Sequence, residues 1–163
     1  MPRAASSIAC PIRSRSPIER SAVSTPTHVH GPFQELVGYE TIVADGRPHL
    51  RLPVRRELLN PHGVLHGGVS LTLLDAIGGR SLIDQRVPAS GQIIMSSVTV
   101  TLTTDFLLGV RDGVLFATGS PDHIGKTVAY VSVQLRHNDL YGPLIARGLG
   151  TYRVYARSLV RPV

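Results

Sequence analysis

Only one segment of this chain has the pattern of a long helix, and that helix must be largely enclosed by the rest of the protein. It runs from about Gly67 to Arg86. Its apolar residues cover more than one helical face, unlike those of a surface helix. They are Val69, Leu71, Leu73, Leu74, Ala76, Ile77, Leu82 and Ile83. With 163 residues the chain has the length of a single domain, large enough to bury such a helix in a core.

The middle of this predicted helix contains the pair Gly78-Gly79. Glycine inside a helix costs about 1 kcal/mol relative to alanine, so two in succession need a reason. Either another backbone or a partner subunit approaches closely at this point, or the helix simply tolerates both glycines. The sequence leaves these two interpretations open.

Strand patterns lie on both sides of the helix. Before it, a short helix or turn over residues 33–37 ends at Gly38, and strands over 39–44 and 50–54 flank an Asp45-Gly46 turn. Pro53 lacks a backbone donor, which predicts an edge position or a bulge. After the helix we expect strands near 97–103, 114–120, 127–137 and 144–155, with turns between them that include residues 121–125. This order predicts an α+β fold in which one antiparallel sheet wraps around one long central helix.

The net charge of +6 is unevenly distributed. Residues 1–26 hold four arginines and one glutamate, and their net charge of +3 is half of the total. The segment is rich in Ser and Pro and has no helical or strand periodicity. We therefore expect residues 1–26 to be a disordered extension and residues 27–163 to form the folded domain. The composition of the tail also resembles an organellar transit peptide, but we rank a plain extension and a cytoplasmic location above targeting.

The composition excludes several classes of protein. The single cysteine cannot form an internal disulfide, and no apolar run approaches the roughly 20 residues of a membrane span. A positive charge can indicate nucleic-acid binding, but no aromatic residues interleave Arg47, Arg51, Arg55 and Arg56, and no zinc-ligand pairs accompany them. We expect neither a nucleic acid nor a membrane as a partner.

The segment with the clearest chemistry is Asn60–Gly68 together with Asp75 in the helix that follows. Asp75 is flanked on both sides by apolar residues, and a carboxylate in such surroundings is costly unless it is hydrogen-bonded or paired. It is either an acid that faces water or caps a neighbouring loop, or a general base or nucleophile on an apolar wall.

His66-Gly67-Gly68 stands where the helix begins. Backbone N–H groups at this position have no acceptor within the helix, and the helix dipole favours negative charge there. The Gly67 N–H could therefore stabilise the oxyanion that develops during acyl transfer. The alternative is that the glycines only space the helix entry and that His66 is a local cap.

These motifs resemble the hot-dog-fold acyl-CoA thioesterases, specifically the phenylacetate-degradation type within the 4-hydroxybenzoyl-CoA thioesterase superfamily. The resemblance covers roughly residues 33–155. It depends on the loop and helix from Asn60 to Asp75, and continues through residues 98–107, 125–127 and 144–148. It implies a helix wrapped by an antiparallel sheet, subunits that pair their sheets as a dimer or a dimer of dimers (a homotetramer), and active sites between subunits.

The resemblance also assigns roles to individual residues. Asp75 matches the catalytic acid, and Gly67 the backbone donor to the thioester oxygen. Asn60 and His66 match residues that shape the loop and help to polarise the carbonyl, and Thr99 matches a water-positioning residue contributed by the neighbouring subunit. Substrate-binding positions fall on Gly68 and on Gly125, Lys126 and Thr127, a turn near the coenzyme A groove.

We therefore expect hydrolysis of an acyl-CoA thioester to a free acid and coenzyme A, with no metal or other cofactor required. A non-catalytic acyl-CoA-binding or sensing module on the same fold ranks second, because such a module could lose Asp75. A hot-dog dehydratase ranks lower, since glycines rather than prolines follow His66. A structural or interaction protein is a further alternative. It would be distinguished from the other three by the absence of saturable coenzyme A binding.

Overall fold

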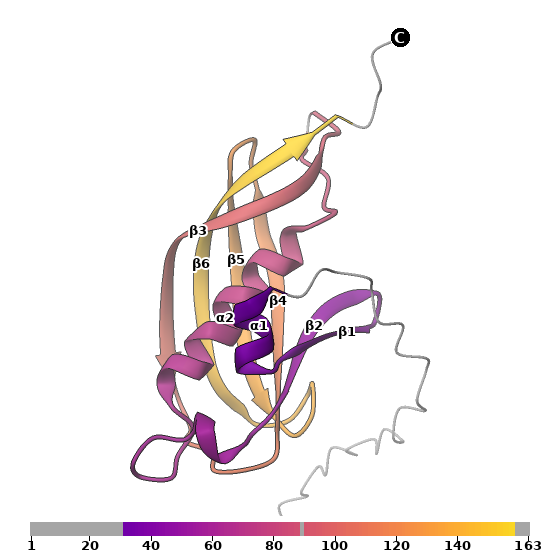
Figure 1. Ribbon diagram of the computed structural model, residues 1–163. Helices are drawn as coiled ribbons and strands as arrows, with labels where there is room; N and C mark the ends of the chain where they lie inside the picture. The colour runs from indigo at the N-terminus through magenta and orange to yellow at the C-terminus, as the bar shows by residue number, and fades with distance from the viewer. Residues whose placement is uncertain (1–30, 89, 159–163) are drawn as a thin grey trace, which may run out of the picture.

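A six-stranded antiparallel sheet curves around one long helix, α2 (Figure 1). The computed structural model describes residues 31–88 and 90–158, so the predicted tail over residues 1–26 lies outside the described part. The helical elements are α1 (Pro32–Val37), the 3-10 helix η1 (Arg56–Leu58) and α2 (Gly67–Leu82). The strands are β1 (Glu40–Ala44), β2 (Arg47–Pro53), β3 (Ile93–Phe106), β4 (Val114–Ile124), β5 (Val128–His137) and β6 (Leu144–Arg157). The strand order is β1-β2-β4-β5-β6-β3. The predicted α+β architecture is confirmed.

The local signals before α2 correspond to the observed elements. α1 ends at Gly38, which adopts the left-handed conformation at φ 83°. Asp45 and Gly46 both have positive φ, as a two-residue type I′ hairpin requires, and they join β1 to β2. Pro53 is the last residue of β2 and lies beyond the residues that pair with β1. Its missing N–H therefore removes no hydrogen bond between β1 and β2.

Several predicted boundaries differ from the observed ones, including both ends of β3, and two of the differences have a clear structural cause. α2 ends at Leu82 instead of Arg86, because Ile83 is extended and Asp84 has a φ of 68°. The chain there pairs with the start of β3, where Asp84 N–H donates to the Ile94 carbonyl. The turn predicted over residues 121–125 begins too early, because β4 continues to Ile124. A register shift between Pro121 and His123 lets the strand accommodate the proline.

The core lies between α2 and the concave face of the sheet. Leu73, Leu74 and Ile77 of α2 are fully buried. They face a layer of strand residues that includes Leu52, Leu115, Ala117, Val131, Val133 and Leu135. The enclosure expected from the apolar pattern of the helix is therefore observed.

The glycine pair in α2 makes room for a side chain of the sheet. A Cβ atom on Gly78 would collide with the ring and hydroxyl of Tyr152 from β6, which is fully buried. A Cβ atom on Gly79 would lie 3.1 Å from Ser97 Oγ of β3. Of the two interpretations left open, close approach applies at Gly78, where the approaching group is a tyrosine side chain of the same chain.

β3 forms one edge of the sheet and is apolar on its exposed side. Val98 and Val100 are 57% and 60% exposed, although their alternation with Ser97 and Thr99 predicts a half-buried strand. The strand pairs with β6 on one side only, so its other side presents unpaired backbone groups within the described chain. Among the described residues, no helix is long and apolar enough to cross a membrane.

We expect Gly78→Ala to destabilise the protein. The added methyl would displace Tyr152, and overpacking of this kind costs about 1–3 kcal/mol even though alanine is the better helix former. Gly79→Ala is the matched control, because only the Ser97 hydroxyl has to move and the gain in helix propensity offsets that shift. Urea unfolding of both variants measures the difference, and equal stabilities would contradict this account of Gly78.

Candidate active site

Asn60 holds the loop before α2 in shape. Its side-chain oxygen accepts hydrogen bonds from the N–H groups of His62 at 2.9 Å and Val64 at 3.2 Å. Gly63 completes the turn with a φ of 68°, and the Arg111 guanidinium donates to the carbonyls of His62 and Gly63. Asn60 therefore acts on the loop backbone, as expected of a loop-shaping residue.

His66 caps the N-terminus of α2. Its Nδ1 accepts a hydrogen bond from the Gly68 N–H at 2.9 Å, so in the neutral ring the proton is on Nε2. This contact is the local cap that was one of the two interpretations of His66. It uses the Gly68 N–H, which is then not available to a bound ligand. The Gly67 N–H, by contrast, has no hydrogen-bond partner among the described residues. Gly67 is therefore the donor available to a bound oxygen at the positive end of the helix.

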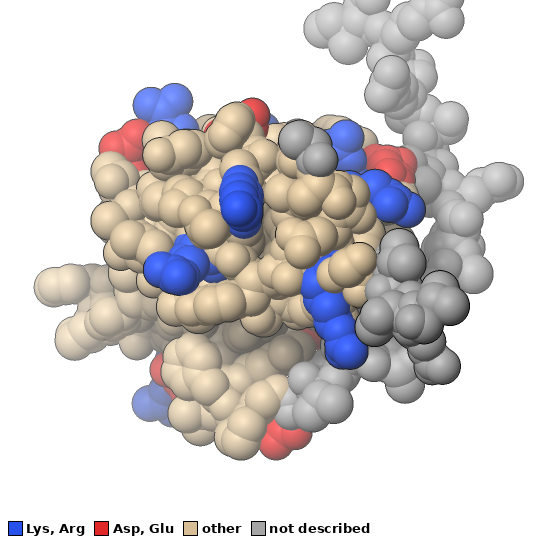
Figure 2. All heavy atoms as spheres, turned by 90° about the horizontal axis from the view of Figure 1, so that it is seen from above, with Lys and Arg blue, Asp and Glu red and all other residues tan. Residues whose placement is uncertain are grey.

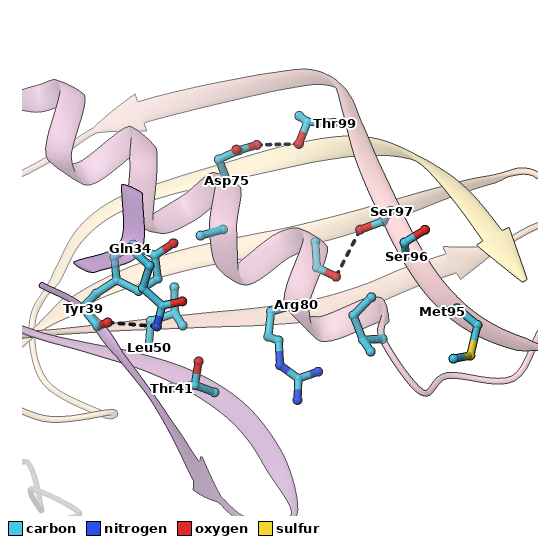
Figure 3. Close-up of a pocket in the computed structure, with 13 residues that line it drawn as sticks. Gln34, Tyr39, Thr41, Leu50, Asp75, Arg80, Met95, Ser96, Ser97 and Thr99 are labelled. Atoms are coloured by element: carbon cyan, nitrogen blue, oxygen red, sulfur yellow. Dashed lines mark hydrogen bonds between the residues drawn. The ribbon is translucent and has the colours of Figure 1, made fainter. Parts of the chain in front are cut away.

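Asp75 lies half-buried in the middle of α2 and faces β3. One carboxylate oxygen accepts a hydrogen bond from the Thr99 hydroxyl at 2.7 Å (Figure 3). This Thr99 belongs to the same chain as Asp75. The expectation that Thr99 also serves the active site of a neighbouring subunit stays a prediction. β3 is wrapped against α2, which places the two side chains together although they are 24 residues apart.

Two tyrosines surround Asp75 and remain neutral. Burial raises the pKa of Tyr152, and the Asp75 charge raises it further. Burial and then the Asp75 charge also raise the pKa of Tyr39. The Tyr152 hydroxyl donates to the backbone carbonyl of Asp75 at 3.3 Å. Both phenols stay protonated at neutral pH, and Tyr152 ties the backbone of Asp75 to the sheet.

Asp75 and Gly67 line different pockets. The pocket beside Asp75 has a volume of about 410 Å³ and lies between α2, the start of β3 and the segment from α1 to β2 (Figure 3). The pocket beside Gly67 has a volume of about 270 Å³ and is mainly apolar, with Phe106, Leu107 and Leu108 in its wall. Eight residues separate Gly67 from Asp75, which is about 12 Å along the helix axis. Within one chain, Asp75 and the Gly67 N–H therefore do not open into the same pocket.

The structure does not bring the remaining predicted residues to these pockets. Gly125, Lys126 and Thr127 form the turn between β4 and β5, where Lys126 is exposed. None of the three lines either pocket. No group of three His, Cys, Asp or Glu residues in the described chain is arranged to hold a metal ion.

The charged side chains on one face of the molecule are dispersed. On the face shown in Figure 2, Lys and Arg side chains are separated by uncharged residues and form no continuous basic patch. Several arginines instead pair locally, such as Arg51 with Glu40 and Arg147 with Asp105.

Sequence reasoning missed three residues at these pockets. Tyr39 precedes β1 and lines the Asp75 pocket, as does Arg80 from the next turn of α2, whereas Tyr152 of β6 bonds the Asp75 backbone. Tyrosine in an alternating strand has the same pattern whether it fills a core or supports a site. The one feature of the sequence that pointed toward Tyr152 was Gly78, because a glycine within a helix can leave room for a large neighbouring side chain.

Comparison with known proteins places the chain among thioesterases. The family profile described as "Thioesterase superfamily" matches residues 62–142. Human acyl-coenzyme A thioesterase 13 is 34% identical over 124 residues, which are 73% of this chain and 82% of that protein. A Bacillus halodurans protein solved with CoA has 30% identity and a TM-score of 0.65, over 77% of this chain and 79% of the other. The Escherichia coli PaaI protein from the phenylacetic acid degradation operon, at 20% identity, has the same fold with a TM-score of 0.64, over 77% and 85% of the two chains.

We expect Asn60→Ala to loosen the loop before α2. Two backbone N–H groups would lose their acceptor, and because His62 is exposed and Val64 only half-buried, each lost bond costs about 0.5–1.5 kcal/mol. Hydrogen exchange should accelerate at His62 and Val64. Asn60→Asp is the control because its carboxylate keeps the acceptor, and equally fast exchange in Asn60→Asp would contradict the assignment.

Proposed function

Because this chain belongs to the thioesterase superfamily of thioester hydrolases, we propose that it hydrolyses acyl-CoA thioesters to a free acid and coenzyme A. The observation that carries the proposal is the half-buried carboxylate of Asp75 on α2, which lines a pocket and accepts a hydrogen bond from Thr99. The acyl-CoA thioesterase of human and the CoA-containing Bacillus halodurans structure support coenzyme A as the carrier.

The chemistry needs one carboxylate and one backbone donor. Asp75 acts as a general base that takes a proton from water, or as a nucleophile that attacks the thioester itself. In the first case the water oxygen bonds to the carbonyl carbon, and the carbonyl oxygen becomes an oxyanion that the Gly67 N–H stabilises. The C–S bond then breaks, the electron pair leaves with sulfur, and the thiolate of coenzyme A takes up a proton.

We further propose that each active site combines Gly67 of one subunit with Asp75 and Thr99 of another. Two groups separated by about 12 Å along one helix do not converge readily on a single carbonyl, which reacts over distances near 3 Å. The open edge of β3, with Val98 and Val100 exposed, offers a surface on which a second copy can pair. A two-fold pairing would create two equivalent sites.

We expect Asp75→Asn to keep the fold and to lower turnover of acyl-CoA substrates by about 10²–10⁴-fold, because the amide cannot accept the proton. The measurement is steady-state hydrolysis of short, medium, long and aryl acyl-CoAs. Asp122→Asn is the control, since Asp122 is an exposed residue of β4 that bonds Ser132. Turnover by Asp75→Asn at the wild-type rate would contradict the role of Asp75 as base or nucleophile. Wild-type protein that binds acyl-CoA without hydrolysing it would favour the non-catalytic binding module.

Gly67→Pro tests the backbone donor with little structural change. Gly67 is the first residue of α2, where proline is tolerated, and His66 already has the extended conformation that precedes proline. The substitution removes the N–H and adds the pyrrolidine ring, whose Cβ has room beside Phe106, and we expect turnover to fall by about 10²–10³-fold. Gly67→Ala keeps the N–H, and its Cβ would make an ordinary contact of 3.6 Å with Phe106.

Mixing the two defective variants tests whether the site is shared. If Gly67 and Asp75 of different subunits cooperate, co-refolded Gly67→Pro and Asp75→Asn chains form mixed dimers with one intact site each. Random pairing then restores roughly a quarter of the wild-type turnover. No recovery in verified mixed dimers would place both groups of a site in one chain.

A further inference from the structure

The pocket beside Asp75 has a mixed lining, in which polar side chains stand beside the apolar Leu50, Ile83 and Met95. Beyond Asp75 and Thr99, its lining includes the side chains of Arg80, Tyr39, Thr41 and Ser96. Pockets for unsubstituted acyl chains are lined mainly by apolar side chains. An alkyl tail in this pocket would remove water from several polar groups without giving them hydrogen-bond partners, which is unfavourable.

Arg80 is the cationic residue among the described residues that line this pocket. It is half-buried on α2 and follows Asp75 by five residues, about 7.5 Å along the helix axis. Figure 3 shows its side chain leaving α2 on the side where Thr41 of β1 lies, whereas Asp75 points toward Thr99 on β3. The pocket therefore has a carboxylate at one side and a guanidinium at the other.

A guanidinium suits a carboxylate ligand. It carries five N–H donors in a planar fork, so two of them can bind both oxygens of a carboxylate while the others keep different contacts. Such charge-assisted pairs are stronger than neutral hydrogen bonds. Because Asp75 and Arg80 leave α2 on different sides, their charged groups lie on different walls of the pocket, and a bound acyl group would have to extend between them.

We propose that Arg80 makes this pocket select acyl groups that end in a carboxylate, so that the preferred substrates are coenzyme A monothioesters of dicarboxylic acids. The proposal rests on the proposed thioesterase function and names its substrate class. Arg80 binds the far carboxylate and thereby positions the thioester carbonyl next to Asp75.

The test compares adipoyl-CoA with hexanoyl-CoA, which have the same number of acyl carbons and differ in the terminal carboxylate. We expect kcat/KM of the wild type to be at least about tenfold higher for adipoyl-CoA, the effect of one hydrogen bond to a charged group. In Arg80→Met that preference should disappear, and in Arg80→Lys it should be reduced. The ratio of two substrates in one enzyme does not depend on the fraction of folded protein, so a partly unfolded variant still gives a valid result.

Arg153→Met is the matched control. Arg153 is exposed on β6, where its guanidinium lies over the Tyr155 ring, and its removal should leave the preference intact. Hydrolysis of both substrates with equal kcat/KM by the wild type, or an unchanged ratio in Arg80→Met, overturns the proposal and leaves the thioesterase function standing.

A failure of the thioesterase function gives a different result. In that case the wild type hydrolyses neither substrate, and calorimetric binding of the same two compounds decides the role of Arg80. Tighter binding of adipoyl-CoA that Arg80→Met abolishes supports the proposal, whereas equal dissociation constants overturn it.

Discussion

The contact between Tyr152 and Gly78 determines how the central helix sits on the sheet. The tyrosine ring occupies the space that any side chain at position 78 would need, so α2 approaches β6 closely only because that position is glycine. Gly119 has the same effect on β4, since a Cβ there would lie 2.9 Å from the Ile77 carbonyl oxygen. The apolar face of α2 is buried through this close approach, and its register against the strands follows from it.

The same contact supports the candidate site. The Tyr152 hydroxyl donates to the carbonyl of Asp75, and burial keeps that hydroxyl protonated. Across the helix, the register of β3 on β6 sets Thr99 opposite Tyr152 and thereby within hydrogen-bond distance of the Asp75 carboxylate. A rigid helix then holds Asp75 far from Gly67, which is why a complete site is proposed to need a second copy.

Much of the fold and part of the site could be predicted from local sequence. Asp45-Gly46 defines a hairpin because both residues accept positive φ, and Asn60 and His66 act on backbone groups within four residues. The end of α2 could not be predicted, because Asp84 leaves the helix to bond Ile94 across a loop. The extension of β4 past Pro121 likewise depends on tertiary pairing, because β5 pairs with β4 on both sides of a bulge at Asp122.

By itself, the sequence determined that one apolar helix had to be enclosed by an antiparallel sheet, and that a shaped loop and an acid stand at its start and centre. Hydrophobic periodicity and turn residues are properties of short segments, so they can be recognised in the sequence without the tertiary structure. The tertiary structure alone decided that Tyr152 fills the space over Gly78, that Thr99 of the same chain holds Asp75, and that Arg80 shares its pocket. These relations join residues from different elements, and only the packing of the sheet around the helix brings them together.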